Sequence, residues 1–495
     1  MWCEWYRLFE PVQPEWMRCL YAAREVTYLL ALASMATPSD QLQLGQTYYA
    51  VTRCQVIKVY YTCCKTRTCM SDDTRGGSSH SRRRFIQATG VAALAGLAGC
   101  SGGGSDDSVE VLHGWTGGDG ATAAEELATA FEAAHSDTGL DMNPIGGGGN
   151  ENLDAVVANR LQSDDPPGAF ANWPGPNLQR YEGALGTVDD VWEENNFEDV
   201  MVDEAIDLHK QDGSFRAVPL GSHRLNCLFY NISVVEEAAI DVDSLNSPEA
   251  LIGAFETVAS ETDAVPMTHA MSGTWTTTQL WAAVMLGEEG YEPYMDFIEG
   301  NGSESSVRAA FERTAEMLEN HISDDAASLN LTSSNQKIIN GEAAFIHQGN
   351  WAAGAYRNTE DFAYEEDWGF KTFPGTEGMY TLHFDSFLYP GNNPTPEASK
   401  TWEAFVGSPE AQIAFNQYKG SIPTRTDVSM DEFGPFLQET AEDFADAEYR
   451  PPNLQHGLGV TAEVRTQLNG VISSEFTGPY NVDAATQRFL DAVSN

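Results

Sequence analysis

Three strand–turn–helix units follow one another from Val109 and constrain the fold more than any other feature of the chain. The first unit is "VEVLHGW", a Gly-rich turn and "ATAAEELATAFEAAH", with apolar residues at helical spacing. The second is "LDMNPI", "GGGGN" and "ENLDAVVANRLQ", and the third begins with "GAFANW" and a Pro-rich turn. Such units predict an α/β protein with a parallel sheet and ligand-facing loops at the carboxyl ends of its strands.

Strand-rich and helix-rich segments then alternate along the rest of the chain. Helical patterns dominate from about residue 247, as in "SPEALIGAFETVAS" and "SSVRAAFERTAEMLENH", and short strands such as "AAFIHQ" return between them. The segment "DWGFKTFPGTEGMYTLHFDSFLYPG" predicts strands with turns, and helices resume from Pro396. Nearly 400 residues suffice for two domains, and this alternation is typical of two lobes between which the chain passes more than once.

The segment "SRRRFIQATGVAALAGLAGCSGGGS" at 81–105 has the order of an export signal: arginines, a short uncharged run and a cysteine. Its apolar run is too short to span a bilayer. The twin arginine resembles a Tat signal, and "LAGC" resembles a lipobox, so we expect residues 70–100 to be a Tat-type signal with lipidation at Cys100. Residues 101–108 are a flexible tether by composition. A basic linker followed by a small-residue helix is the plain alternative.

Residues 1–69 differ in composition from the rest of the chain. They carry six of the eight cysteines and show no sustained helical or strand period. A disulfide module or a metal knuckle would be conceivable, but "CCKTRTC" lacks the paired spacing of a zinc site. We therefore expect residues 1–69 to be a mis-assigned extension, with translation starting at Met70.

The charge balance excludes some partners. Residues 101–495 hold 16 Lys and Arg against 66 Asp and Glu, so nucleic acid and anionic membrane surfaces would be repelled. Scattered acids and scarce lysine are typical of a protein from an organism that lives in molar salt, where screening weakens the repulsion. Only Cys227 remains besides Cys100 after the signal, so the domain must depend on an apolar core.

Four tryptophans stand beside turn-forming residues and are candidates for ligand stacking: Trp115, Trp173, Trp275 and Trp351. A pyranose ring covers an indole face well and leaves its hydroxyls free for hydrogen bonds. Singly, each is more often a packing residue, but four in the same context favour a carbohydrate cleft. The other tryptophans of the mature chain, Trp192, Trp281, Trp368 and Trp402, lie in helical or strand patterns and are expected to pack.

Polar partners for sugar hydroxyls are expected in predicted loops. There, side chains such as Asp, Asn, Arg and His can each form hydrogen bonds with two hydroxyl groups. The candidates are Asp119, Asn150, His223, Arg224, Asn226, Asp385, Lys419 and His456. Several of them also have a purely structural interpretation. Asp119 could cap a helix, Lys419 could stand at a helix end before a glycine, and His223 and Arg224 could be neighbouring surface residues.

The chain from about Val109 to the end resembles the solute-binding proteins of ABC sugar importers, in particular the bacterial glucose/galactose-binding type. The resemblance rests on segments in the same order, including "HGWTGGDG", "GGGGNENLDAVVANRL", "VPLGSHRLNCLFYN", "GEAAFIHQGNWAAG", "DSFLYPG", "YKGSIPTR" and "LQHG". It implies a type II periplasmic-binding-protein-like fold, with one sugar bound between two lobes joined by hinge strands. Lobe 1 would comprise 109–221 and about 372–425, and lobe 2 would comprise 222–371 and about 426–495.

The resemblance also implies roles for single residues. Trp275 and Trp351 would stack on the sugar and Trp115 would close the near side, while polar groups would come from the hinge and loops: His223, Asn226, Asp385, Lys419 and His456. The chain departs from the family at two places. Gly114 precedes Trp115 where relatives have two adjacent aromatics, and Trp173 stands where they have a histidine, so both differences concern the walls of the pocket.

The function predicted from the sequence is therefore the substrate-binding component of an ABC transporter. It would capture a glucose-like monosaccharide or a short oligosaccharide outside the cell and deliver it to permease subunits and their ATPase. We expect a lipid-anchored monomer with no cofactor, no metal and no enzymatic activity, in line with the lack of nucleophile-elbow, zinc-protease and phosphate-loop motifs. An exported glycoside hydrolase is the main alternative, and a binder of a metal or peptide is a weaker one.

Overall fold

The computed structural model describes residues 108–118 and 120–494. The predictions for residues 1–69, for the signal at 70–100, for lipidation of Cys100, for the tether at 101–107 and for Asp119 concern residues outside this range. Among the described residues, no helix combines the length and apolar character needed to cross a membrane.

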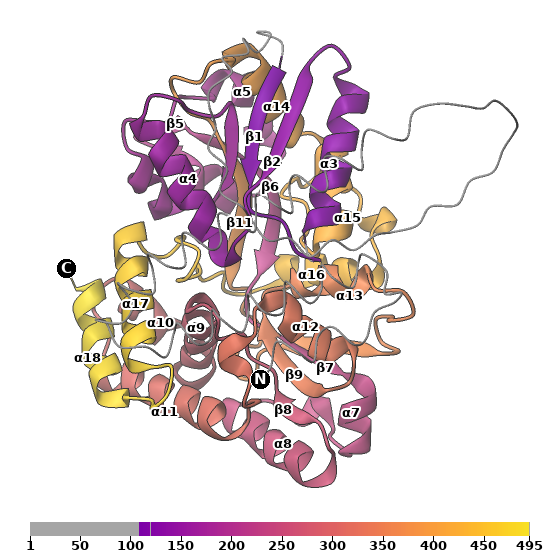
Figure 1. Ribbon diagram of the computed structural model, residues 1–495, viewed down its shortest axis with the longest axis vertical. Coiled ribbons are helices and arrows are strands. Elements are labelled where there is room, and N and C mark those ends of the chain that lie inside the picture. Colours follow the sequence, from indigo (N-terminus) through magenta and orange to yellow (C-terminus); the bar gives the residue numbers. More distant parts are fainter. Residues whose placement is uncertain (1–107, 119, 495) are drawn as a thin grey trace, which may run out of the picture. The chain divides into compact units, whose positions relative to one another are not determined.

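The first lobe is built on a five-stranded sheet in the order β2-β1-β3-β11-β6 (Figure 1). Its strands are β1 (Ser108–His113), β2 (Gly139–Pro144), β3 (Ala169–Asn172), β6 (Ala217–Arg224) and β11 (Leu382–Leu388). β1 runs parallel to β2 and β3, whereas β11 is antiparallel to both β3 and β6. The predicted α/β class is confirmed, but the expectation of an all-parallel sheet is wrong. β11 is reversed because the chain enters it from the second lobe and not through a crossover helix.

Helices cover both faces of this sheet. They are α3 (Ala121–Ala134), α4 (Glu151–Gln162), α14 (Pro396–Val406) and α15 (Pro409–Lys419). Successive strand residues alternate between two apolar clusters: Val111 packs with α3, α14 and α15, and Leu112 packs with α4. This alternation follows from the pleat of the strand, which directs neighbouring side chains to opposite faces. The continuous apolar strands of the sequence are therefore buried on both sides.

The second lobe contains a four-stranded sheet in the order β10-β7-β9-β8. Its strands are β7 (Cys227–Asn231), β8 (Val265–Met267), β9 (Ala343–Gln348) and β10 (Trp368–Thr372). Its main helices are α7 (Ile232–Glu237), α8 (Pro248–Glu261), α9 (Trp275–Glu289), α11 (Glu304–Asn320) and α12 (Leu331–Ile339). Smaller elements complete the two lobes: α5 (Asp189–Glu194), α6 (Asp203–Leu208), β4 (Lys210–Gln211), β5 (Ser214–Phe215), α10 (Tyr291–Ile298) and α13 (Ala352–Arg357).

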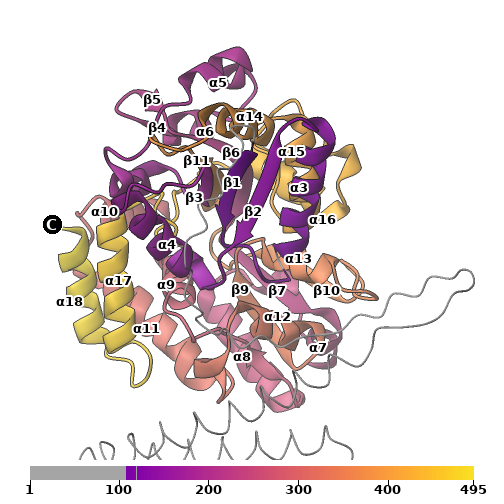
Figure 2. The same ribbon diagram turned by 45° about the horizontal axis from the view of Figure 1, so that its top comes forward.

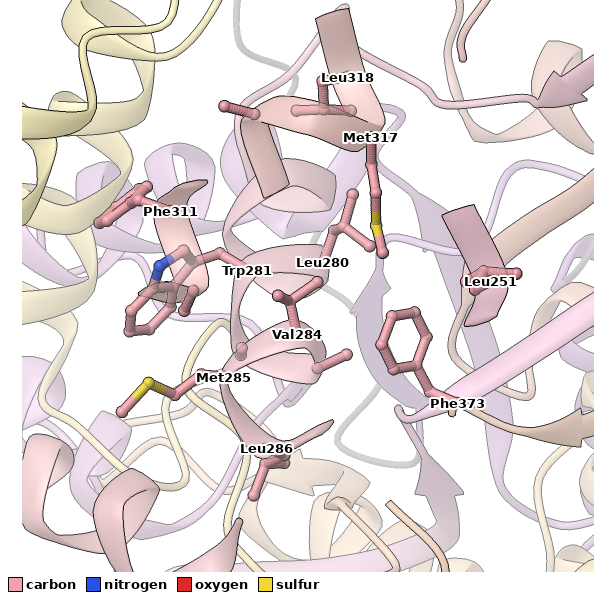
Figure 3. Packing of buried hydrophobic residues seen from close by; sticks show 14 of the residues in the cluster. Leu251, Leu280, Trp281, Val284, Met285, Leu286, Phe311, Met317, Leu318 and Phe373 are labelled. Carbon is pink, nitrogen blue, oxygen red and sulfur yellow. The ribbon is translucent and has the colours of Figure 1, made fainter. Parts of the chain in front are cut away.

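Helix α9 is the centre of the second lobe. Every residue from Trp275 to Leu286 is buried, and its side chains point to all sides (Figure 3). Trp281 contacts Phe311 of α11 at 5.2 Å between ring centroids and Phe489 at 4.9 Å. A helix that is buried on all sides is held by packing in every direction. The residue at its N-terminus, Trp275, is consequently fixed in space.

The chain crosses between the two sheets at several places. The first crossing is at 224–227, where β6 continues into β7, and the second is at 373–381, where β10 leads back to β11. The third follows α15 and leads to α16 (Pro435–Asp446), which packs with Phe229 and Trp368 of the second lobe. The last helices, α17 (Ala462–Glu475) and α18 (Val482–Val493), pack against α9 and α11 (Figure 2). The predicted two-lobed architecture is confirmed, and the exact lobe boundaries stay a prediction.

The tryptophans expected to pack do so. Trp192, Trp281, Trp368 and Trp402 are each at most 1 % exposed. Trp192 stacks on Phe215 at 3.7 Å between ring centroids, and Trp402 meets the edge of Phe387 at 5.0 Å.

Glu403 of α14 is a buried carboxyl group with neither oxygen hydrogen-bonded, and burial raises its pKa well above the usual value. The folded state therefore binds a proton that the unfolded chain releases above its ordinary carboxyl pKa. The stability that this proton contributes is lost as the pH rises from that value through the folded-state pKa.

We predict that Glu403→Gln raises the free energy of unfolding at pH 8 by about 1–3 kcal/mol, because the amide needs no proton to stay neutral. The gain should shrink towards pH 4. Thermal or denaturant unfolding at both pH values checks this, and Glu397→Gln in the exposed first turn of α14 is the matched control. An equal or lower stability of the Glu403→Gln variant at pH 8 would contradict the prediction.

Candidate functional site

A cavity of about 350 Å³ opens between the two lobes. Both lobes contribute to its walls, so its shape depends on how far they are closed. Its lining contains aromatic, small and charged residues: Gly114, Trp115, Thr116, Gly117, Gly147, Gly149, Asn150, Glu151, Trp173, Ala270, Ser272, Gly273, Trp275, Asn330, Leu331, Thr332, Trp351, His383, Asp385, Lys419 and His456.

The wall from the first lobe is formed by loops after strands, as expected for an α/β sheet. Trp115 follows β1, Trp173 follows β3, and Asn150 immediately precedes α4. Trp115 rests on the lobe 1 core, with its ring 4.8 Å from Phe415 and 5.7 Å from Phe387 between centroids. It is only partly buried, so it can still meet a ligand.

The wall from the second lobe is formed at the N-termini of helices. Trp275 is the first residue of α9, Trp351 precedes α13, and Asn330 caps α12 through a bond from the Ser333 amide to its side chain. The first backbone N–H groups of a helix have no partner within the helix. Here the Ser333 amide donates to Asn330, and the Ala352 and Ala353 amides donate to the carbonyls of Gly349 and Asn350, so the turns before α12 and α13 satisfy these groups.

Aromatic rings enclose one end of the cavity. Trp275 and Trp351 lie 6.3 Å apart between centroids at 56°. His456 meets Trp351 at 5.2 Å and Trp173 at 4.7 Å, both edge to face. Trp173, Trp275 and Trp351 are 4 %, 8 % and 6 % exposed, so the apolar surface they present is almost closed to solvent.

The polar floor is centred on Asp385 of β11. Its Oδ2 lies 3.0 Å from His223 Nε2, and its Oδ1 lies 3.4 Å from His383 Nε2. The pairing of β6 with β11 sets His223 directly opposite His383. Burial by itself would raise the pKa of Asp385, but His223, His383 and Lys419 outweigh it and hold the pKa well below its usual value. The floor thus carries an ionised carboxylate.

The two histidines facing the cavity are neutral near pH 7. Burial lowers the pKa of His383 to about 4 and that of His456 well below its ordinary value. A neutral imidazole can donate from one ring nitrogen and accept at the other. Such side chains suit hydroxyl groups, which both donate and accept.

Lys419 ends α15, and the next residue, Gly420, has φ 91°, the left-handed conformation that glycine adopts at helix ends. A β-carbon on Gly420 would lie 2.5 Å from the Asn350 carbonyl oxygen and 3.0 Å from the Gly354 nitrogen of the second lobe. The helix-end role proposed for Lys419 and its place in the cavity are therefore compatible. At Gly420 the backbones of the two lobes touch.

The structure brings together most of the residues singled out in the sequence. Eight of them line the cavity: Trp115, Asn150, Trp173, Trp275, Trp351, Asp385, Lys419 and His456. His223 lies directly behind this lining, fully buried between Asp385 and Asn350, whose Oδ1 is 2.6 Å from His223 Nδ1. It orients Asp385 and does not form part of the cavity surface.

Arg224 and Asn226 are placed away from the cavity. The Arg224 guanidinium forms an ion pair with Asp443 of α16 and donates to the Met379 carbonyl at 3.0 Å. Asn226 donates to the same carbonyl at 3.0 Å and to Thr376 Oγ1 at 2.9 Å. Arg224 is the last residue of β6 and Asn226 lies in the link to β7, so their side chains connect the chain crossings. The sequence could not separate this position from the neighbouring His223.

Several lining residues were not predicted, notably His383, Glu151, Ser272, Asn330 and Thr332. His383 had a usable signal. It stands two residues before Asp385 in "LHFDSF", and alternate residues of a strand point to the same face. Glu151 is the first residue of α4 and directly follows the predicted Asn150, whereas Ser272, Asn330 and Thr332 come near the cavity only through packing of the second lobe.

Among the described residues, no group of three or more His, Cys, Asp or Glu side chains is arranged to hold a metal ion.

Comparison with known proteins identifies the class to which this two-lobed architecture belongs. The family model described as bacterial extracellular solute-binding protein matches residues 126–443. A xylose/arabinose-binding protein of Haloferax volcanii is 42 % identical over 86 % of this chain and 100 % of its own length. The chain belongs to the family of bacterial extracellular solute-binding proteins, which confirms the resemblance noted in the sequence.

Two further comparisons agree with this family. An uncharacterised ABC transporter extracellular-binding protein of Pyrococcus horikoshii is 28 % identical over 78 % of this chain and 87 % of its own. The solved structure of a chitin oligosaccharide binding protein superposes with a TM-score of 0.67 at 17 % identity, covering 78 % of this chain and 98 % of that one. At this identity the likeness concerns the fold.

The histidine environment gives a prediction that requires no ligand. In the folded protein we expect the His383 ring to titrate with a midpoint near 4, whereas in denaturant it should titrate near 6.5. Histidine-labelled NMR, with His383→Gln for assignment, measures both. Because the folded state then binds fewer protons than the unfolded chain, this residue should lower stability as the pH falls through 6.5 towards 4. A folded-state midpoint near 6.5 would contradict the burial described here.

The position of Trp351 gives a second prediction. A β-carbon on Gly349 would lie 2.5–2.7 Å from three carbons of the Trp351 ring, which also donates to Gln348 Oε1 at 3.1 Å. Gly349→Ala should therefore displace the ring, change the near-UV circular dichroism and lower stability by about 1–3 kcal/mol. Gly253→Ala on α8, where nothing lies within 4 Å, is the matched control and should be neutral or stabilising. Equal spectra and stability for both variants would refute this role of Gly349.

Proposed function

We propose that the protein captures a sugar outside the cell and delivers it to the membrane permease of an ABC importer. The observation that carries this proposal is the composition of the cavity: tryptophans from both lobes surround a floor with an ionised carboxylate and neutral imidazoles. An indole face covers the C–H face of a sugar ring, and carboxylate and imidazole groups bind hydroxyls. Family membership supports the role of a solute-binding component.

The proposed contacts assign one task to each part of the cavity. Trp275 and Trp351 stack on the ring, and Trp115 closes the side nearest the first lobe. Asp385 accepts hydrogen bonds from hydroxyl groups, since its ionised form offers two acceptor oxygens. Lys419 donates one and His456 can donate or accept, while Asn150 contributes from the start of α4.

We propose a monosaccharide as the first ligand to test. A cavity of about 350 Å³ holds one sugar ring with ordered water, or a short oligosaccharide at most. The 42 % identical relative is named for xylose and arabinose, so aldopentoses come first, and a glucose-like hexose, as the sequence suggested, comes second.

The mechanism we propose is lobe closure. A sugar that contacts both walls binds the closed form better than the open one and shifts the population towards it. The permease would then recognise the closed form. We further propose that the protein acts as a monomer at the outer face of the membrane, exported through the Tat route and held by a lipid on Cys100, with 101–108 as the tether.

The glycoside hydrolase alternative needs two carboxyl groups, one of them protonated to act as general acid. Asp385 and Glu151 both line the cavity. The pKa of Asp385 is held well below its usual value, so this group does not supply the acid at neutral pH. We propose a binder without catalytic activity, which membership of a solute-binding family supports. Incubation with xylobiose and maltose distinguishes the two functions, because a hydrolase releases monosaccharides and a binder does not.

The deciding experiment is isothermal titration calorimetry in high salt against D-xylose, L-arabinose, D-glucose, D-galactose and the two disaccharides. We expect a saturable isotherm with at least one monosaccharide. No heat with any of them would overturn the proposal.

Trp275→Ala should weaken binding of the best sugar by about 1–3 kcal/mol through lost burial and stacking. Tyr291→Ala is the matched control, because it removes a ring stacked on Tyr449 at 4.4 Å and outside the cavity lining. An unchanged dissociation constant for the Trp275→Ala variant would reject the stacking role. An equal loss in both variants would reject it as well.

A further inference from the structure

Arg465 joins the two lobes without lining the cavity. Its helix, α17, is anchored in the lobe 2 core by Leu468, Val471 and Ile472. Its guanidinium nevertheless reaches Asp154 of α4 in the first lobe, with 3.2 Å between Nη2 and Oδ2. The side chains are 8 % and 9 % exposed, so the contact is almost free of solvent. Figure 1 shows α17 beside α4, although about 300 residues separate them in the sequence.

Asp154 is held in place by its own lobe. Asn172 donates to Oδ1 at 2.9 Å, the Tyr181 hydroxyl donates to the same oxygen at 3.4 Å, and Arg180 forms an ion pair with Oδ2. These partners all come from lobe 1: Asn172 ends β3, and Arg180 and Tyr181 follow it in the chain. The carboxylate is therefore a fixed acceptor, and the contact with Arg465 depends on the position of the second lobe.

The same guanidinium covers Trp173. Its central carbon lies 5.0 Å from the centroid of the indole, a distance at which a cation is attracted to an aromatic face. His456 meets the same ring edge to face at 4.7 Å. Trp173 lines the cavity, whereas Arg465 lies behind it. The ring is thus held between the cavity and a buried cation.

We propose that Arg465 is a positioning residue for ligand capture: it fixes the Trp173 ring in the cavity wall and fastens the second lobe to α4, whose first residues line the same cavity. This inference rests on the proposed function, because it names a determinant of the same site. Arg465 is expected to change the rate at which the closed form opens more than it changes the contacts between the protein and the sugar.

The physical consequence is a kinetic one. Opening must separate a buried charge pair and uncover an aromatic face, so removal of the cation should speed release of the ligand. Loss of one partner of a buried charge pair changes mainly the dissociation rate, whereas association is set by diffusion and steering. A residue that only stabilised the fold would lower stability without this kinetic signature.

The ligand test compares Arg465→Met, which keeps the length of the side chain, with Arg465→Lys, which keeps the charge. Arg488→Met on α18 is the matched control, because it removes a more exposed ion pair with Glu475. Stopped-flow tryptophan fluorescence with D-xylose, or with whichever sugar binds in the calorimetric screen, gives both rate constants. We expect Arg465→Met to raise the dissociation rate by about tenfold, with association within about twofold. Arg465→Lys should recover part of the effect, and the control should match the wild type.

A second test needs no sugar and so separates this inference from the proposed function. Small-angle X-ray scattering and amide hydrogen exchange on the ligand-free protein should show a larger radius of gyration for Arg465→Met and faster exchange in α4. Exchange in α9 should be unchanged. If no sugar binds the wild type and these changes are still seen, the proposed function fails and the role of Arg465 between the lobes stands.

The proposal is overturned if Arg465→Met leaves the dissociation rate, the radius of gyration and the exchange of α4 unchanged. It is also overturned if both Arg465 variants fail to fold, because Arg465 would then be a structural core residue. The double variant Asp154→Asn/Arg465→Met adds a check: its effect on the dissociation rate should be less than the product of the two single effects. Full multiplicativity would show that the two residues act independently.

Discussion

The pairing of β6 with β11 is the contact on which both the hinge and the cavity depend. Each strand lies in the first sheet and is continuous with a crossing to the second, since β6 leads into β7 and β11 follows β10. The same pairing sets His223 opposite His383 and presents Asp385 to the cavity. A shift of register by one residue would turn these side chains to the other face and would also misalign the crossings.

The two walls of the cavity are held in different ways. In the second lobe, Trp275 continues a helix packed on every side, and its position is fixed by the core. In the first lobe, Trp115 and Trp173 stand on loops, and their positions depend on neighbours such as Phe415 and Arg465. The site therefore combines a rigid wall with one that is adjusted by contacts behind it.

Features that depend on local sequence were predictable. The helix periods of α4, α8 and α11 and the strands β1, β3 and β9 follow from apolar spacing, and the turn contexts of four tryptophans pointed to one cavity. Features that depend on pairing across the chain were not. The reversed direction of β11, the place of Arg224 among the crossings and the meeting of His383 with Asp385 arise from contacts more than 100 residues apart or from strand register.

The glycine after Lys419 has a consequence for how such a molecule can change over evolutionary time. At Gly420 the backbones of the two lobes are in contact with no side chain between them, so this point acts as a pivot between the lobes. One added methyl group there would press on the Asn350 carbonyl and alter the angle between the lobes, although Gly420 itself does not line the cavity. Ligand preference could therefore drift through a position that no inventory of binding residues would contain.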